Sequence, residues 1–157
     1  MPLRLTTAQA RALGIRPSAR ADRPADGMNR LERGFRDAVL APALARGQLL
    51  AYWREPLRFR LGGRCSFCPD FAAIEPDGRL VLIELKGGWF RDDAKVKTKV
   101  AAATYPHFGW LLVFREGRHG WQTRRVDGQG IGREPTRVAW IHGAGRAPGE
   151  RPAAPGH

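Results

Sequence analysis

Residues 68–88 read CPDFAAIEPDGRLVLIELKGG, which is two apolar segments joined by the turn-forming residues 76–78. A Pro-Asp-Gly sequence between apolar runs of four to eight residues is typical of a tight turn between two strands. We therefore expect antiparallel strands at about 68–74 and 79–86. Together they predict a meandering sheet at the centre of the fold.

Three charged residues lie within these apolar segments, namely Asp70, Glu84 and Lys86. Side chains alternate faces along a strand, so Glu84 and Lys86 project from the same side. Asp70, near the start of the first strand, faces the end of the second, which brings the two carboxylates within reach of one cation. Singly, Asp70 is explained as a turn carboxylate and Glu84 as half of an ion pair. Together they indicate function, because buried ion pairs stabilise a core weakly.

Two carboxylates with water and a backbone carbonyl, here that of Leu85, form a hard oxygen site suited to Mg²⁺ or Mn²⁺. Such a metal acidifies water and stabilises charge on a phosphodiester under attack. Lys86 is placed to orient the attacking water or to neutralise the developing charge. The pattern therefore predicts metal-assisted hydrolysis of a phosphodiester.

Lysine use supports a special role for Lys86. The chain has only four lysines, at 86, 95, 97 and 99, among 27 Lys and Arg residues. All four fall in one window that begins at the predicted site. Helix propensity or chance explains the last three equally well, but not a lysine flanked by apolar strand residues.

The rest of the chain predicts further helices and strands around this meander. Asn29 is a suitable helix N-cap, Pro42 bends or ends the first part of that helix, and Gly47 closes it. An apolar strand that follows a helix favours a parallel neighbour. In chain order we expect a helix over 30–47, a strand over 49–61, the two strands above, a helix over 92–105, a buried strand over 110–114, and edge strands over 121–126 and 136–141.

The chain is expected to form one domain, over 29–142. Residues 1–28 predict a mobile arm with one short helix, and residues 143–157 a disordered tail. No apolar run approaches the ~20 residues that span a bilayer, and the start of the chain lacks the apolar stretch of a secretion signal. We therefore expect a cytoplasmic protein that has no membrane partner.

Charge and cysteine content suggest what the protein binds. Lys and Arg outnumber Asp and Glu by 27 to 15, giving a net charge of +12. Such an excess favours nucleic acid over an ordinary solvated basic surface. Cys65 and Cys68 form one isolated CxxC, which predicts a reduced thiol pair before a strand, with a structural zinc site as the alternative.

The residues Pro69-Asp70, a 13-residue spacer and Glu84-Leu85-Lys86 resemble the motif of the PD-(D/E)XK nuclease superfamily. The predicted order of helix, three strands, helix and strand also resembles that superfamily. Residues 3–126 look like the small phage and prophage nucleases related to Holliday junction resolvases. The resemblance implies a restriction-endonuclease-like α/β core with a mixed sheet.

The resemblance also implies residue roles. Asp70 and Glu84 would bind the divalent metal and Lys86 would serve the nucleophilic water. Glu32 on the first helix would be an additional acid for the metal site, although it suits an ion pair with Arg36 at i+4 equally well. Glu55 is a lesser candidate.

We therefore hypothesise a Mg²⁺-dependent endonuclease for branched DNA, active in DNA recombination and of phage or prophage origin. Symmetric cuts in a junction favour a two-fold homodimer. Alternatives are a less selective nickase or restriction-like nuclease, and a non-catalytic DNA-binding module. The residues expected to contact DNA phosphates are Arg58, Arg60, Arg64, Arg91, Lys95, Lys97 and Lys99.

Overall fold

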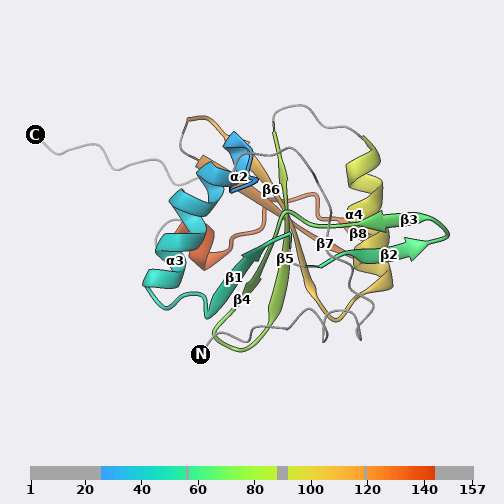
Figure 1. Ribbon diagram of the computed structural model, residues 1–157, viewed down its shortest axis with the longest axis horizontal. Helices are drawn as coiled ribbons and strands as arrows, with labels where there is room; N and C mark the ends of the chain where they lie inside the picture. Colours follow the sequence, from blue (N-terminus) through green and yellow to red (C-terminus); the bar gives the residue numbers. More distant parts are fainter. Residues whose placement is uncertain (1–25, 56, 88–91, 119, 144–157) are drawn as a thin grey trace, which may run out of the picture.

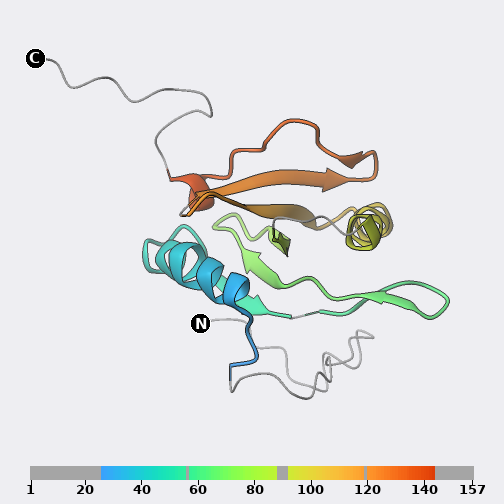
Figure 2. The same cartoon turned by 90° about the horizontal axis from the view of Figure 1, so that it is seen from above.

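The computed structural model describes residues 26–55, 57–87, 92–118 and 120–143. A six-stranded sheet lies between two helical layers, with α2 and α3 on one face and α4 on the other (Figures 1 and 2). The elements are α2 Arg30–Phe35, η1 Arg36–Leu40, α3 Ala41–Ala45, β1 Ala51–Arg54, β2 Phe59–Gly62, β3 Cys65–Phe67, β4 Phe71–Ile74, β5 Leu80–Lys86, α4 Asp92–Thr104, β6 Gly109–Glu116, β7 Gly120–Asp127, β8 Gly130–Ile131 and α5 Ala139–His142.

The sheet has the strand order β1-β4-β5-β6-β7-β8. Strands β1, β4 and β5 form an antiparallel meander, and β6 lies parallel to β5 after the α4 crossover. Strand β7 then returns antiparallel to β6. The predicted mixed sheet is confirmed, as is its order of helix, three strands, helix and strand. This is the restriction-endonuclease-like arrangement that the motif resemblance implies.

The first helix begins where the sequence predicts and is less regular than expected. The side chain of Asn29 accepts a hydrogen bond from the Glu32 backbone, and Glu32 bonds back to the Asn29 backbone, which forms a capping box. The middle of the helix, η1, is a π-helix that leads into Pro42 in the first turn of α3. Because proline has no backbone N–H, an ordinary helical hydrogen bond cannot form at that position.

The single strand predicted over 49–61 is wrong. Strand β1 ends at Arg54, and Glu55 has a φ of +41°, which non-glycine residues rarely adopt. The chain then leaves the sheet and forms a separate hairpin of β2 and β3, so β4 starts at 71 instead of 68. Beyond the break, Leu57, Phe59 and Leu61 alternate with Arg58 and Arg60, and this alternation favours one continuous strand.

The sheet buries a hydrophobic layer on each face. On the α2 side, Phe35 is fully buried and its ring lies 4.9 Å from that of Trp121 and 6.1 Å from that of Phe71. On the α4 side, Ala101 and Ala102 allow the helix to approach the sheet closely. These two layers hold β4 and β5 rigidly between them.

The strand predicted over 136–141 is also wrong, because α5 occupies residues 139–142. Trp140 on α5 is buried, and its indole N–H donates to the Glu75 carboxylate at 2.8 Å. A short apolar run such as Val138 to Ile141 does not distinguish helix from strand by periodicity. Within the described ranges, no helix has the length and apolar character needed to cross a membrane.

Candidate active site

Asp70 and Glu84 lie opposite each other at the end of the β4–β5 ladder. Phe71 pairs with Ile83 as the last pair of the ladder, and Asp70 and Glu84 are the residues next to that pair on the two segments. The charge of Glu84 contributes to the raised pKa of Asp70, so the two acids are near neighbours. Such cross-strand neighbours share a face and have Cβ atoms about 5 Å apart. The backbone N–H of Leu85 donates to Asp70 Oδ2 at 2.8 Å and fixes that carboxylate against β5. The two acids therefore lie near each other, and their sharing of one cation stays a prediction.

The turn between the strands sets this register. The Gly78 N–H donates to the Glu75 carbonyl at 2.9 Å, and the Glu75 N–H donates to the Arg79 carbonyl at 3.0 Å. Gly78 has a φ of +85°, a conformation that favours glycine. The Pro-Asp-Gly sequence therefore closes a tight connection and aligns the two acids.

Ionisation of both carboxylates is unfavourable at these buried positions. Burial raises the pKa of Asp70 from its ordinary 3.8 to about 8, and repulsion from Glu84 contributes to that rise. Burial also raises the pKa of Glu84, while the charge of Lys86 opposes this. Without a cation between them, the pair does not carry two full negative charges near neutral pH.

Lys86 pairs with one oxygen of Glu84 and leaves the other without a partner. Lys86 Nζ lies 2.5 Å from Glu84 Oε1, and each side chain is only 12% exposed. Glu84 Oε2 is buried and has no hydrogen-bond partner among the described residues. A buried carboxylate oxygen without a donor costs stability, so this atom is suited to receive a cation.

These residues fit a hard divalent metal such as Mg²⁺ or Mn²⁺. The N–H and C=O of one strand residue point toward the same neighbouring strand. Because the Leu85 N–H points toward Asp70, the Leu85 carbonyl points to that side as well. In the part of the chain that the structure describes, no cluster of three or more His, Cys, Asp or Glu side chains could hold a metal ion. Two carboxylates and a carbonyl suffice for Mg²⁺, which keeps several waters and binds substrate phosphate.

Glu32 lies close to this pair but has partners of its own. It is 2% exposed, and its negative charge contributes to the raised pKa of both Asp70 and Glu84. Its carboxylate accepts from the Asn29 side chain at 2.6 Å and from Arg54 Nε at 3.2 Å. Glu32 therefore caps α2 and faces the site.

Arg54 connects Glu32 to the end of β1, and sequence reasoning missed it. Its Nη2 donates to the Gly27 carbonyl at 2.5 Å and lies 3.3 Å from Glu55 Oε1. The Glu55 N–H donates to the Asp70 carbonyl at 2.8 Å, which places Glu55 beside Asp70 just beyond the end of β1 and before the start of β4. No sequence pattern separates Arg54 from the many other arginines, because its partners are distant in the chain.

Replacing Arg54 by methionine is expected to lower the free energy of unfolding by about 1–2 kcal/mol. The change keeps the aliphatic stem but leaves the buried Glu32 carboxylate without its cation. Arg46→Met is the control, because Arg46 is exposed and its side chain bonds only to Gln48 among the described residues. Urea denaturation of both variants measures the difference, and equal midpoints would show that Arg54 does not support Glu32.

The residues predicted to contact DNA fall into two groups. Lys95 and Lys99 on α4 line a pocket together with Lys86, whereas Lys97 does not line it. The other group lies on the β2–β3 hairpin beside α4, where Arg58 bonds the Ser66 hydroxyl (Figure 1). Arg60 and Arg64 are exposed on this hairpin, and Arg91 lies outside the described residues.

Cys65 is the first residue of β3 and Cys68 follows its last residue, and both are free thiols. Burial raises the pKa of Cys68 to about 11, and the charge of Glu55 contributes to that rise. The Cys68 thiol is therefore protonated at neutral pH and unreactive as a nucleophile.

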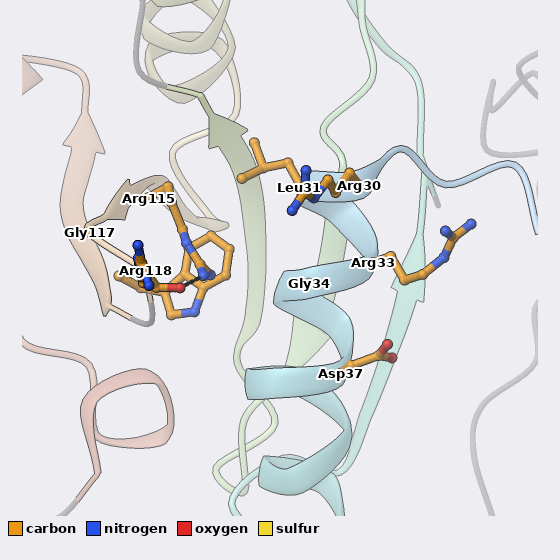
Figure 3. Close-up of a pocket in the computed structure, with 9 residues that line it drawn as sticks. Arg30, Leu31, Arg33, Gly34, Asp37, Arg115, Gly117 and Arg118 are labelled. Atoms are coloured by element: carbon orange, nitrogen blue, oxygen red, sulfur yellow. Dashed lines mark hydrogen bonds between the residues drawn. The ribbon is translucent and has the colours of Figure 1, made fainter.

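Another pocket, of about 830 Å³, lies between α2 and the β6–β7 turn (Figure 3). Arg33 at its rim bonds Asp26, and Arg115 stacks on Trp121 with its guanidinium carbon 4.6 Å from the ring centre. Arg115 also donates to the Arg118 carbonyl. These cations are already engaged, and neither Asp70 nor Glu84 lines this pocket.

No family model and no curated protein matches the chain. Among solved structures, it is similar to Hjc, a Holliday junction resolvase from the archaeal hyperthermophile Archaeoglobus fulgidus. The two are 21% identical over 58% of this chain and 73% of that chain, with a TM-score of 0.39.

Proposed function

We propose that this chain is a metal-dependent DNA endonuclease that hydrolyses phosphodiester bonds and prefers branched DNA such as a Holliday junction. The observation that carries the proposal is the buried, facing pair of Asp70 and Glu84 with Lys86 beside it. A fold without a function for these charges would be more stable with apolar residues there.

The residues divide the chemistry between them. Asp70, Glu84 and the Leu85 carbonyl would hold the divalent cation, which when bound supplies Lewis-acid chemistry that acidifies water and offsets phosphate charge. The ammonium of Lys86 has three donors, of which Glu84 Oε1 takes one. The other two are available to orient the attacking water and a non-bridging phosphate oxygen.

The substrate class rests on charge. A net charge of +12, with basic residues on α4 and on the β2–β3 hairpin, favours a polyanion such as DNA. The preference for branched DNA, the two-fold homodimer, the role in recombination and the phage or prophage origin follow from the motif resemblance. A cytoplasmic location is proposed from the sequence analysis alone.

Cleavage of a four-way junction, a flap and a plain duplex with Mg²⁺ tests the function. We expect the junction to be cut at least about tenfold faster than the duplex, through paired symmetric nicks, and EDTA to stop cleavage. Equal rates on all three would favour the less selective nuclease. Binding to every substrate without cleavage in Mg²⁺ or Mn²⁺ would favour the non-catalytic module.

A further inference from the structure

A strongly basic pocket lies on the α4 face beside Lys86, and we call it the basic pocket. Its volume is about 440 Å³. None of the described residues that line it is acidic. Like charges held this close repel one another, so the pocket is suited to a ligand with several negative charges. The cations that line it are Lys86, Lys95, Lys99, Arg115, Arg124 and Arg133.

The sheet register relates this pocket to the acidic pair. Glu84 pairs with Leu112, and Leu112 pairs with Arg124, so the three occupy one row across β5, β6 and β7. Cross-strand neighbours share a face, which puts Arg124 on the same face as Glu84. Two strand spacings separate them, about 10 Å.

Arg124 is held in place without a carboxylate. Its guanidinium carbon lies 5.8 Å from the ring centre of Phe114, a second residue of the pocket. Its Nε is buried and has no hydrogen-bond partner, and no acid pairs with it in the described part of the chain. A guanidinium positioned by an aromatic ring, and not neutralised, is suited to bind phosphate through its fork of donors.

We propose that the basic pocket binds backbone phosphates of the cleaved DNA strand within about three nucleotides of the bond that is cut, with Arg124 and Arg133 as phosphate-binding residues. The distance follows from the ~10 Å between Glu84 and Arg124 and the ~3.4 Å rise per nucleotide. This inference rests on the proposed nuclease function and extends the DNA surface to β7 and the segment after β8. Lys86 pairs with Glu84 and Arg115 stacks on Trp121. The other four cations of the pocket still exceed what a single phosphate needs, which favours a strand over a small anion.

The test compares neighbouring arginines on β7 in the full chain. Arg124→Gln removes the charge from the pocket, while Arg125→Gln removes the same charge on the opposite face, where Arg125 lines a different pocket with Trp140. Arg133→Gln is a second test variant, because Arg133 is exposed after β8 and its loss leaves the core intact. Fluorescence anisotropy with a labelled duplex and a four-way junction in EDTA, over salt on the order of 50–200 mM, measures binding without turnover.

Arg124→Gln and Arg133→Gln are each expected to weaken DNA binding about fivefold and to reduce the salt slope by about one. Arg125→Gln should stay within about twofold of wild type. If the protein cuts DNA, KM should rise about fivefold for the two test variants with little change in kcat.

Equal binding and equal salt slopes for all three variants would overturn the inference. So would displacement of DNA by micromolar pyrophosphate at constant ionic strength, which would make the pocket a small-anion site. Because binding is measured in EDTA, a chain that shows the Arg124 effect but never cuts DNA would refute the nuclease function and would support only the part of the inference that assigns DNA phosphates to the basic pocket.

Discussion

Asp70→Asn is expected to reduce Mg²⁺-dependent cleavage by about 10³-fold or more while leaving DNA binding in EDTA within about twofold. Asparagine keeps the shape of the side chain and can still accept the Leu85 N–H through its amide oxygen. It removes one of the two carboxylates that would hold the cation, so the chemical step is lost and the fold is kept.

The same substitution is expected to stabilise the metal-free fold. The Asp70 pKa is raised from 3.8 to about 8 on folding, so its contribution to stability is complete below about pH 4 and is lost as the pH rises to 8. An amide at this position does not titrate and has no such dependence. At pH 8 without metal, the free energy of unfolding of the variant should exceed that of wild type by about 1–3 kcal/mol.

Urea denaturation in EDTA at pH 5 and pH 8, with cleavage assays on the same preparations, measures both effects. Asp77→Asn is the matched control, because Asp77 is an exposed acid in the turn of the same meander. It should change neither cleavage nor the pH dependence. An Asp70→Asn variant that is less stable than wild type at pH 8 would contradict the argument, as would one that still cuts DNA.

Lys86→Met is expected to abolish cleavage and to lower the free energy of unfolding by about 2–3 kcal/mol at pH 8. Breaking a buried ion pair from one side leaves a charge without compensation, which typically costs about 3–5 kcal/mol. We expect a loss below that range because each side chain of the pair remains 12% exposed.

The double variant Glu84→Gln with Lys86→Met separates this cause from simple loss of packing. Removing both charges should restore most of the stability lost in Lys86→Met, although cleavage stays absent. Chemical denaturation of both single variants and the double variant completes the cycle. If the stability changes of Glu84→Gln and Lys86→Met simply add in the double variant, the Lys86–Glu84 contact does not contribute to stability as the structure indicates.

The sequence predicts the centre of this fold well, because local rules govern it. The Pro-Asp-Gly turn and the alternation around it are sufficient to place β4 and β5 side by side, with Asp70 and Glu84 next to the last pair of their ladder. The α4 crossover and the apolar run of β6 are sufficient to predict a parallel strand. In each case the pattern extends over neighbours in the chain.

The remainder depends on contacts that sequence patterns do not record. The break at Glu55 is a single backbone conformation between two strands, and the roles of Arg54 and Arg124 arise from residues on other elements. On α5, Trp140 is buried and donates to Glu75, 65 residues earlier. Arginine is so frequent in this chain that composition hides the few arginines with specific partners.

The exposed connection at 76–79 has a consequence for recognising related chains. Hydrogen bonding between β4 and β5, and not the count of intervening residues, holds Asp70 against Glu84. Extra residues at that tip would loop outward into solvent and leave both acids in position. The length of this spacer is therefore free to vary among homologues, and a search that fixes it at 13 residues would overlook nucleases with the same arrangement of acids.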